Sequence, residues 1–163
     1  ISILIIKINI MNIVKIIKIV FSLILGVMLI LGGIKKFEKP SPAPTEIVEK
    51  VKNGETVAPS VEILKIKNYI FGMKQTGYFW QFLGIMELLA GVLLLSQVST
   101  LLGAILALPL TINIFLFHYF LEPHEVGELF QMLGLLLINL ALIGFSYKLW
   151  KPLLFDKSIL KLN

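Results

Sequence analysis

The chain has 163 residues, 57% of them hydrophobic, and a mean hydropathy of +0.91. Ordinary soluble domains are about 45–50% apolar, so this composition predicts an integral membrane protein, and the length fits one compact bundle. The net charge of +5 comes from lysines alone, because the chain has no arginine, and it also has no cysteine. The absence of cysteine excludes disulfides, thiolate metal centres and thiol redox chemistry within the chain. The absence of arginine argues against nucleic-acid binding, which relies on this residue.

The N-terminal residues 1–12 leave two interpretations open. If this segment is helical, Lys7, Lys15 and Lys18 fall within an arc of about 80°, as in a basic helix that lies at the membrane surface. Alternatively, the sequence from Met11 onward looks like a natural start, and the residues before it are a misassigned extension. A cleaved signal peptide is not expected, because "LGGIKKF" lacks the small-x-small cleavage pattern.

Four apolar segments are predicted to cross the membrane. The length of each segment is close to that of a membrane-spanning helix, which needs about 20 residues to cross about 30 Å of hydrocarbon. Lysines at the ends of the first segment can reach the interface, and a Tyr-Phe-Trp run opens the second at the depth where aromatic residues collect. The predicted fold class is an all-α integral membrane four-helix bundle with a long polar loop between helices 1 and 2. The spans are 13–34, 77–96, 101–121 and 129–147, in a transmembrane domain over 13–151.

The loop over 35–76 mixes lysine, glutamate and spaced prolines. The prolines favour an extended polyproline segment, Thr45 is placed to cap a short helix that an Asn-Gly pair stops, and an interfacial helix is expected over 61–71. Four spans put both termini, including the tail over 152–163, on one side. The turn after the third span contains no lysine, which favours the outer face for that turn and the cytoplasm for the termini.

Glu87 is the most informative polar residue, because it lies near the centre of the second span. A carboxylate at that depth costs at least about 2.5 kcal/mol on insertion scales, so it needs a partner or a proton. Gly84, Glu87 and Gly91 share one helix face within about 60°, and small residues on a face allow helices to approach closely. Glu87 is therefore expected to face the bundle interior.

Polar residues of the third and fourth spans are expected to meet Glu87 in that interior. Its predicted hydrogen-bond partner is Asn113 or Asn139 at mid-depth, with His118 and Glu122 nearer the turn. The alternative is that these groups only fix helix packing, at about 0.6–2 kcal/mol each. No catalytic residue is assigned. The candidates for ligand binding or proton handling are Glu87, His118, Gln81, Asn113, Asn139 and Glu122.

The stretch "HYFLEPHEVGE" raises the question of a metal site, since His118 and Glu122 are four residues apart, as are His124 and Glu128. It matches neither the H-E-x-x-H arrangement nor the Glu-x-x-His pair of di-iron bundles. The two histidines of the chain lie six residues apart around a proline, so one chain cannot hold a haem between facing helices. No metal site and no intrinsic cofactor are expected.

Three stretches together resemble the DoxX family of small four-helix bacterial membrane proteins: "LGGIKKFEKPSPAP", "FGMKQTGYFWQFLGIMELLAGVLLLS" and "LLGAILALPLTINIFLFHYFLEP". The shared features are glycine then lysines closing the first span, Gly-Tyr-Phe-Trp opening the second, a central glutamate followed by glycine, and Pro-x-x-x-Asn then His in the third. The resemblance covers nearly the whole chain from Met11. It implies a multi-pass location in the bacterial inner membrane and association with membrane-bound oxidoreductase complexes, such as a thiosulfate:quinone oxidoreductase.

Three functions remain open on these grounds. The first is a DoxX-type subunit of a redox-linked membrane complex with a quinone or another lipid-soluble ligand between helices. In it Glu87 and His118 handle protons or contact the ligand, and Gln81, Asn113 and Asn139 orient them. The second is a non-catalytic accessory or assembly subunit, and the third is a small lipid-handling or transport protein. The expected partners are the lipid bilayer and other membrane subunits or a second copy, with no nucleic acid, and whether the chain is an enzyme is left open.

Overall fold

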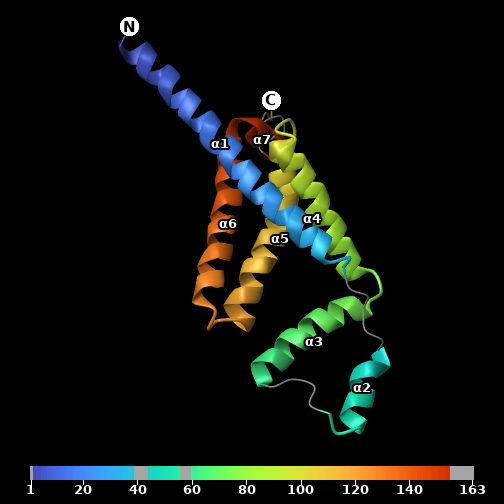
Figure 1. Cartoon of the computed structure of the whole chain (residues 1–163). Helices are drawn as coiled ribbons and strands as arrows, with labels where there is room; N and C mark the ends of the chain where they lie inside the picture. Colours follow the sequence, from blue (N-terminus) through green and yellow to red (C-terminus); the bar gives the residue numbers. More distant parts are fainter. Residues whose placement is uncertain (1, 39–43, 56–59, 155–163) are drawn as a thin grey trace, which may run out of the picture.

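The computed structural model describes residues 2–38, 44–55 and 60–154, and within these ranges every regular element is an α-helix. The helices are α1 (Ser2–Lys35), α2 (Pro44–Lys52), α3 (Val61–Gln75), α4 (Phe79–Leu95), α5 (Thr100–Leu121), α6 (Val126–Phe145) and α7 (Tyr147–Leu154). The long helices α1, α4, α5 and α6 lie together, with α3 near one end of them and α7 at the other (Figure 1). The start of α1 and the short α7 are therefore at the same end of the molecule.

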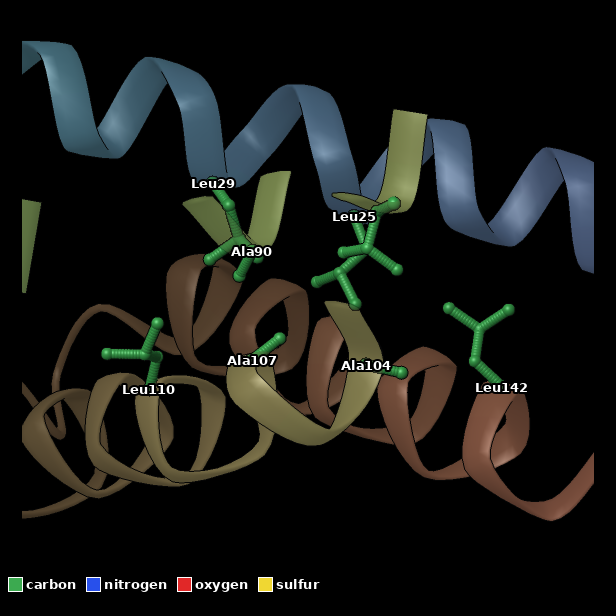
Figure 2. Close-up of a cluster of buried hydrophobic side chains, with 8 residues drawn as sticks. Leu25, Leu29, Ala90, Ala104, Ala107, Leu110 and Leu142 are labelled. Atoms are coloured by element: carbon green, nitrogen blue, oxygen red, sulfur yellow. The ribbon is translucent and has the colours of Figure 1, made fainter. Parts of the chain in front are cut away.

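Apolar side chains fill the centre between these four helices. Helix α1 packs against α4 and α6, and α5 packs against the same two helices. The buried apolar residues, most of them labelled in Figure 2, are Leu25, Leu29, Ala90, Leu94, Ala104, Ala107, Leu110 and Leu142. The outer faces also carry large exposed apolar side chains, such as Ile85, Val92, Leu102 and Leu137. Helices that are apolar on both their inner and outer faces are typical of a lipid environment, so this is a helical, multi-pass membrane protein.

Three helical segments are long and apolar enough to cross a bilayer on their own: Met11–Lys35 of α1, α5 and α6. Helices α3 and α4 meet this criterion only as a pair, which is bent by 90° at the break between them. At about 1.5 Å per residue, the 17 residues of α4 cover about 25 Å, slightly less than the hydrocarbon thickness. The predicted helical membrane architecture is confirmed at this level, with three candidate spans, or four if the bent pair counts as one.

Glycines bring the backbones of α1 and α4 into close contact. A Cβ atom added to Gly91 would lie 2.6 Å from Ile30 Cγ1 and 2.9 Å from the Gly26 carbonyl oxygen. One added to Gly33 would lie 3.0 Å from the Gly84 carbonyl oxygen. Distances this short leave no room for a side chain. The prediction that Gly84 and Gly91 allow close helix approach is confirmed.

Both helices predicted between the first two spans are present. Helix α2 begins at Pro44, one residue before the expected cap at Thr45, and α3 continues to Gln75, past the expected end at residue 71. Ser60 precedes α3 in extended conformation, and its hydroxyl accepts the backbone N–H of Ile63, which satisfies a donor in the first turn. The prolines at 40 and 42 lie outside the described residues.

The two ends of the chain differ from expectation in helix length. Helix α1 runs from Ser2, so residues 2–10 continue the helix of the first span. The fourth span was predicted to run to residue 147, whereas α6 ends at Phe145 and the separate helix α7 follows. The Trp150 indole N–H donates to the Ile143 carbonyl oxygen at 2.9 Å, so α7 folds back onto the end of α6. Residues 155–163 of the predicted tail lie outside the described part of the chain.

Candidate functional site

Glu87, near the middle of α4, forms an ion pair with Lys36, the residue that follows the end of α1. The Lys36 Nζ lies 2.7 Å from both carboxylate oxygens of Glu87, and the two side chains are only 15% and 4% exposed, respectively. The prediction that Glu87 faces the interior is confirmed. Its predicted partner was wrong, because a lysine rather than Asn113 or Asn139 balances the carboxylate.

Lys36 was missed because, from sequence alone, it belongs with the lysines that flank the spans. Two signals point to it. First, a carboxylate buried in a membrane protein needs a counter-charge. Second, when two helices pack antiparallel, as α1 and α4 do, the C-terminal end of the first lies beside the N-terminal half of the second. The glycine contacts between α1 and α4 then bring the flexible lysine side chain within reach of Glu87.

Trp80, in the first turn of α4, connects this ion pair to α3. The Lys36 Nζ lies 5.2 Å from the Trp80 ring centroid, and the Nζ of Lys74, from α3, lies 5.2 Å from the same centroid. Each such cation–π contact is worth about 0.5–2 kcal/mol. The indole ring therefore holds the C-terminal end of α3 beside the ion pair and offers an attractive surface to two ammonium groups that repel each other.

A cavity of about 200 Å³ lies beside the ion pair, between α3, α4 and α5. Apolar side chains make most of its wall, and one side carries polar groups. The lining residues are Lys36, Tyr69, Ile70, Met73, Trp80, Leu83, Glu87, Leu110, Asn113, Ile114, Phe117 and His118. Three of the predicted site residues, Glu87, Asn113 and His118, therefore come together at one cavity.

Tyr69 on α3 closes one side of the cavity against α5. Its hydroxyl donates to Asn113 Oδ1 at 2.9 Å, and its ring lies 5.5 Å from that of Phe117. Helix α3 has no fully buried residue, and this contact and the one at Trp80 connect it to α5 and α4. Asn113 was predicted to bond to Glu87, and the structure instead assigns it to α3, a helix that was expected only as a surface element.

An apolar groove of about 550 Å³ lies next to the cavity, along the outer side of α5. The groove and the cavity share Tyr69, Asn113 and Phe117. The other groove residues are Pro109, Ile112, Leu116, Phe120 and Leu121. A compact space with polar groups on one side therefore adjoins a long apolar surface, and Tyr69, Asn113 and Phe117 form the wall between them.

His118 uses both ring nitrogens on the far side of the cavity, at the α5–α6 turn. Its Nδ1 lies 2.8 Å from the Ile114 carbonyl oxygen, and its Nε2 lies 3.4 Å from Glu122 Oε2 and 3.5 Å from Glu128 Oε2. The predicted proximity of His118 and Glu122 is confirmed, and Glu128 is an additional member of this cluster. Both ring nitrogens therefore face protein groups of α5 and the α5–α6 turn, and the ring also lines the cavity.

Asn139 does not belong to the cavity. It is fully buried on α6, and in the amide orientation that pairs every donor with an acceptor, its Nδ2 donates to the Ala104 carbonyl oxygen at 2.9 Å. Its Oδ1 accepts from the Leu108 N–H at 3.1 Å and the Thr111 hydroxyl at 3.0 Å. Asn139 therefore serves the backbone of α5 immediately before Pro109, where a proline disturbs the helical hydrogen bonds.

Gln81 lies in the first turn of α4 and also does not line the cavity. Its side-chain carbonyl oxygen is buried and has no hydrogen-bond partner among the described residues. An unpaired buried acceptor of this kind costs about 1–3 kcal/mol. The predicted role of Gln81 in orienting Glu87 stays a prediction.

No match was found when the chain was compared with models of known protein families, with curated proteins and with solved structures.

Proposed function

We propose that this protein is a four-helix integral membrane protein of the DoxX type, located in the bacterial inner membrane, that binds a lipid-soluble ligand of the quinone class as a subunit of a redox-linked complex. In this proposal α1, α4, α5 and α6 are the four spans. Helix α3 lies in the membrane interface and covers the ligand site. The observation that carries the proposal is the cavity beside the Lys36–Glu87 pair, together with the adjoining α5 groove.

The size of the cavity suits one substituted ring. An apolar protein cavity of about 150 Å³ accommodates benzene, and the cavity here is about 200 Å³. Apolar walls from Leu83, Leu110 and Ile114 would contact the ring, in the manner of small-molecule sites that combine hydrophobic surface with a few polar groups.

The polar side of the cavity offers hydrogen-bond donors, which a quinone requires because its carbonyl oxygens only accept. The Lys36 ammonium has three N–H donors, and two of them go to Glu87. The third is available to a ligand oxygen, as is the Asn113 amide nitrogen. Glu87 stands next to this donor and would accept one of the two protons released when a quinol is oxidised, and return it when a quinone is reduced. The second proton would exchange with water, and the two electrons would pass to a partner subunit in the oxidation and come from it in the reduction.

The groove along α5 would hold the apolar tail of such a ligand. It is adjacent to the cavity at Tyr69, Asn113 and Phe117, so a head group in the cavity and a tail on α5 would connect where the Tyr69–Asn113 hydrogen bond opens. The groove residues face outward, where the tail would exchange directly with the membrane.

The competing proposal is an accessory subunit whose polar groups only fix helix packing. The Lys36–Glu87 pair favours this reading in one respect, since the carboxylate is already neutralised without any ligand. In that case the cavity would hold lipid of no particular kind.

Small molecules extracted from the gently purified protein distinguish these proposals. We would compare the wild type with Asn113→Phe, which places a ring between cavity and groove, and with Ile105→Phe, a matched substitution at an exposed position of the same helix that lines neither space. A Glu87→Gln variant is measured alongside.

A quinone that is present near one per chain in the wild type and in Ile105→Phe, and lost in Asn113→Phe, is the expected result. Bulk phospholipid in every sample would contradict quinone binding and support the accessory subunit. One phospholipid species that is retained by the wild type and lost only in Asn113→Phe would instead indicate lipid handling.

A further inference from the structure

Two carboxylates and an imidazole converge at the α5–α6 turn, outside the head-group end of the cavity. His118 and Glu122 lie in and directly after the last turn of α5, and Glu128 lies in the first turn of α6. One donor atom from each residue lies within 4.8 Å of the others. The turn over 122–128 contains three glutamates and no lysine, so the local charge is negative.

The hydrogen bond of the His118 ring determines which nitrogen faces the carboxylates as an acceptor. A carbonyl oxygen can only accept, so the 2.8 Å contact with the Ile114 carbonyl requires the proton on Nδ1. When the ring is neutral, its Nε2 presents a lone pair to two carboxylate oxygens. Three acceptors facing one another repel, and a cation between them removes the repulsion.

The same ring arrangement is typical of metal-binding histidines. Such residues donate their second ring N–H to a backbone carbonyl or carboxylate, which fixes the tautomer and the ring orientation. In His118 this partner is the Ile114 carbonyl, one turn earlier on α5. The bond therefore aims Nε2 at the space between Glu122 and Glu128.

Two of the three donor-atom separations fit a tetrahedral ion. Zinc bonds of about 2.0–2.2 Å at tetrahedral angles separate two donor atoms by about 3.4 Å. The two distances from His118 Nε2 are 3.4 Å to Glu122 Oε2 and 3.5 Å to Glu128 Oε2. The Glu128 side chain is 59% exposed, so it can adjust the remaining carboxylate separation without disturbing the helices.

We propose that His118, Glu122 and Glu128 bind one divalent transition-metal ion of the zinc class. A neutral imidazole and two carboxylates carry a charge of −2, which the ion balances. Imidazole favours zinc and similar metals over magnesium and calcium, which prefer oxygen ligands. Three protein ligands leave the fourth position open to water, since Glu128 faces solvent. The ion would also connect the end of α5 to the start of α6.

Zinc titration of the full-length protein in detergent tests this proposal after chelator treatment and removal of the chelator. The wild type should bind one Zn²⁺ per chain by calorimetry and by elemental analysis. Loss of a residue that only hydrogen-bonds to a metal ligand weakens metal binding by about 10–100-fold. His118→Ala and Glu128→Gln should each weaken zinc binding by more than this. Because Glu128 does not line the cavity, Glu128→Gln should leave any copurifying quinone unchanged.

The same turn provides matched controls. His124→Ala and Glu125→Gln remove the same two chemical groups from residues that are not part of the cluster, so both should keep the wild-type zinc affinity. The proposal is overturned if the wild type binds no stoichiometric Zn²⁺, or if His124→Ala weakens binding as much as His118→Ala. Circular dichroism of each variant confirms that the helices are intact.

Discussion

Lys36 places its ammonium group 2.7 Å from both oxygens of Glu87, across the interface between the end of α1 and the middle of α4. This is the described ion pair with the least solvent exposure. It explains how a carboxylate is tolerated at this depth of an apolar helix, since the cost of burying a charge falls when a partner with good geometry is buried with it.

Replacing one member of this pair should therefore lower the stability of the fold much more than replacing both. We expect Lys36→Met or Glu87→Met to lower the free energy of unfolding by about 3–5 kcal/mol, because each leaves one uncompensated charge. The double variant should recover most of the loss. Unfolding in detergent, followed by circular dichroism for all four proteins of the cycle, measures the coupling.

Additive losses of stability in the double variant would show that the two residues stabilise the fold independently, through packing, and that their ion pair contributes nothing. A matched control is Lys50→Met, which breaks the exposed pair between Lys50 and Glu46 on α2. Exposed pairs of this kind contribute about 0–1 kcal/mol, so this variant should differ little from wild type.

Replacing a glycine at the α1–α4 interface should destabilise the fold. The Cβ of Gly91→Ala would meet Ile30 and the Gly26 carbonyl at 2.6 and 2.9 Å, and overpacking of this kind costs about 1–3 kcal/mol. Gly134→Ala and Gly144→Ala on α6 are the controls, because an added Cβ there meets nothing within 4 Å. These should be neutral or slightly stabilising, since alanine favours helix. Equal melting temperatures for Gly91→Ala and the controls would contradict close packing of α1 on α4.

Asn139 should matter for the stability of α5 rather than for ligand binding. Asn139→Leu leaves the Ala104 carbonyl and the Leu108 N–H without their side-chain partner, and a buried unsatisfied group costs about 1–3 kcal/mol. Thr111→Val removes one hydroxyl from the same group and should cost less. Thermal unfolding gives both values. Unchanged stability in Asn139→Leu, with loss of any copurifying ligand, would go against the structural role assigned here.

Much of the architecture could be predicted from the sequence because it depends on local patterns. Apolar segments of near-membrane length mark α1, α5 and α6, and the glycine face of α4 predicts its close contact. Glu87 could be placed in the interior because an ionisable group on an apolar helix cannot face lipid without cost. These inferences need only the periodicity of a single helix.

The parts that could not be predicted are relations between helices. Lys36 looks like any other lysine at a membrane edge until the register of α1 on α4 is known. Glu128 lies ten residues from His118 in the sequence, so no helical spacing connects them, and only the tight α5–α6 turn brings them together. Tyr69 reaches Asn113 because α3 folds back at 90° to α4, and a bend of that size is not encoded in any single segment.

The absence of cysteine makes membrane topology directly testable with single-cysteine variants. Val98, 91% exposed, lies in the turn between α4 and α5, and Glu125 lies in the turn between α5 and α6. If the four helices span the membrane with cytoplasmic termini, Glu125→Cys should react with a membrane-impermeant maleimide on intact cells. Val98→Cys should react only after the cells are opened.

Ile85→Cys, on the outer face of α4, should stay unlabelled in both conditions, because a thiol in hydrocarbon neither ionises nor meets the reagent. Reaction of Val98→Cys and Glu125→Cys from the same side would mean that α5 does not cross. Reaction of Ile85→Cys would remove α4 from the membrane, and with it the depth on which the role of Glu87 depends.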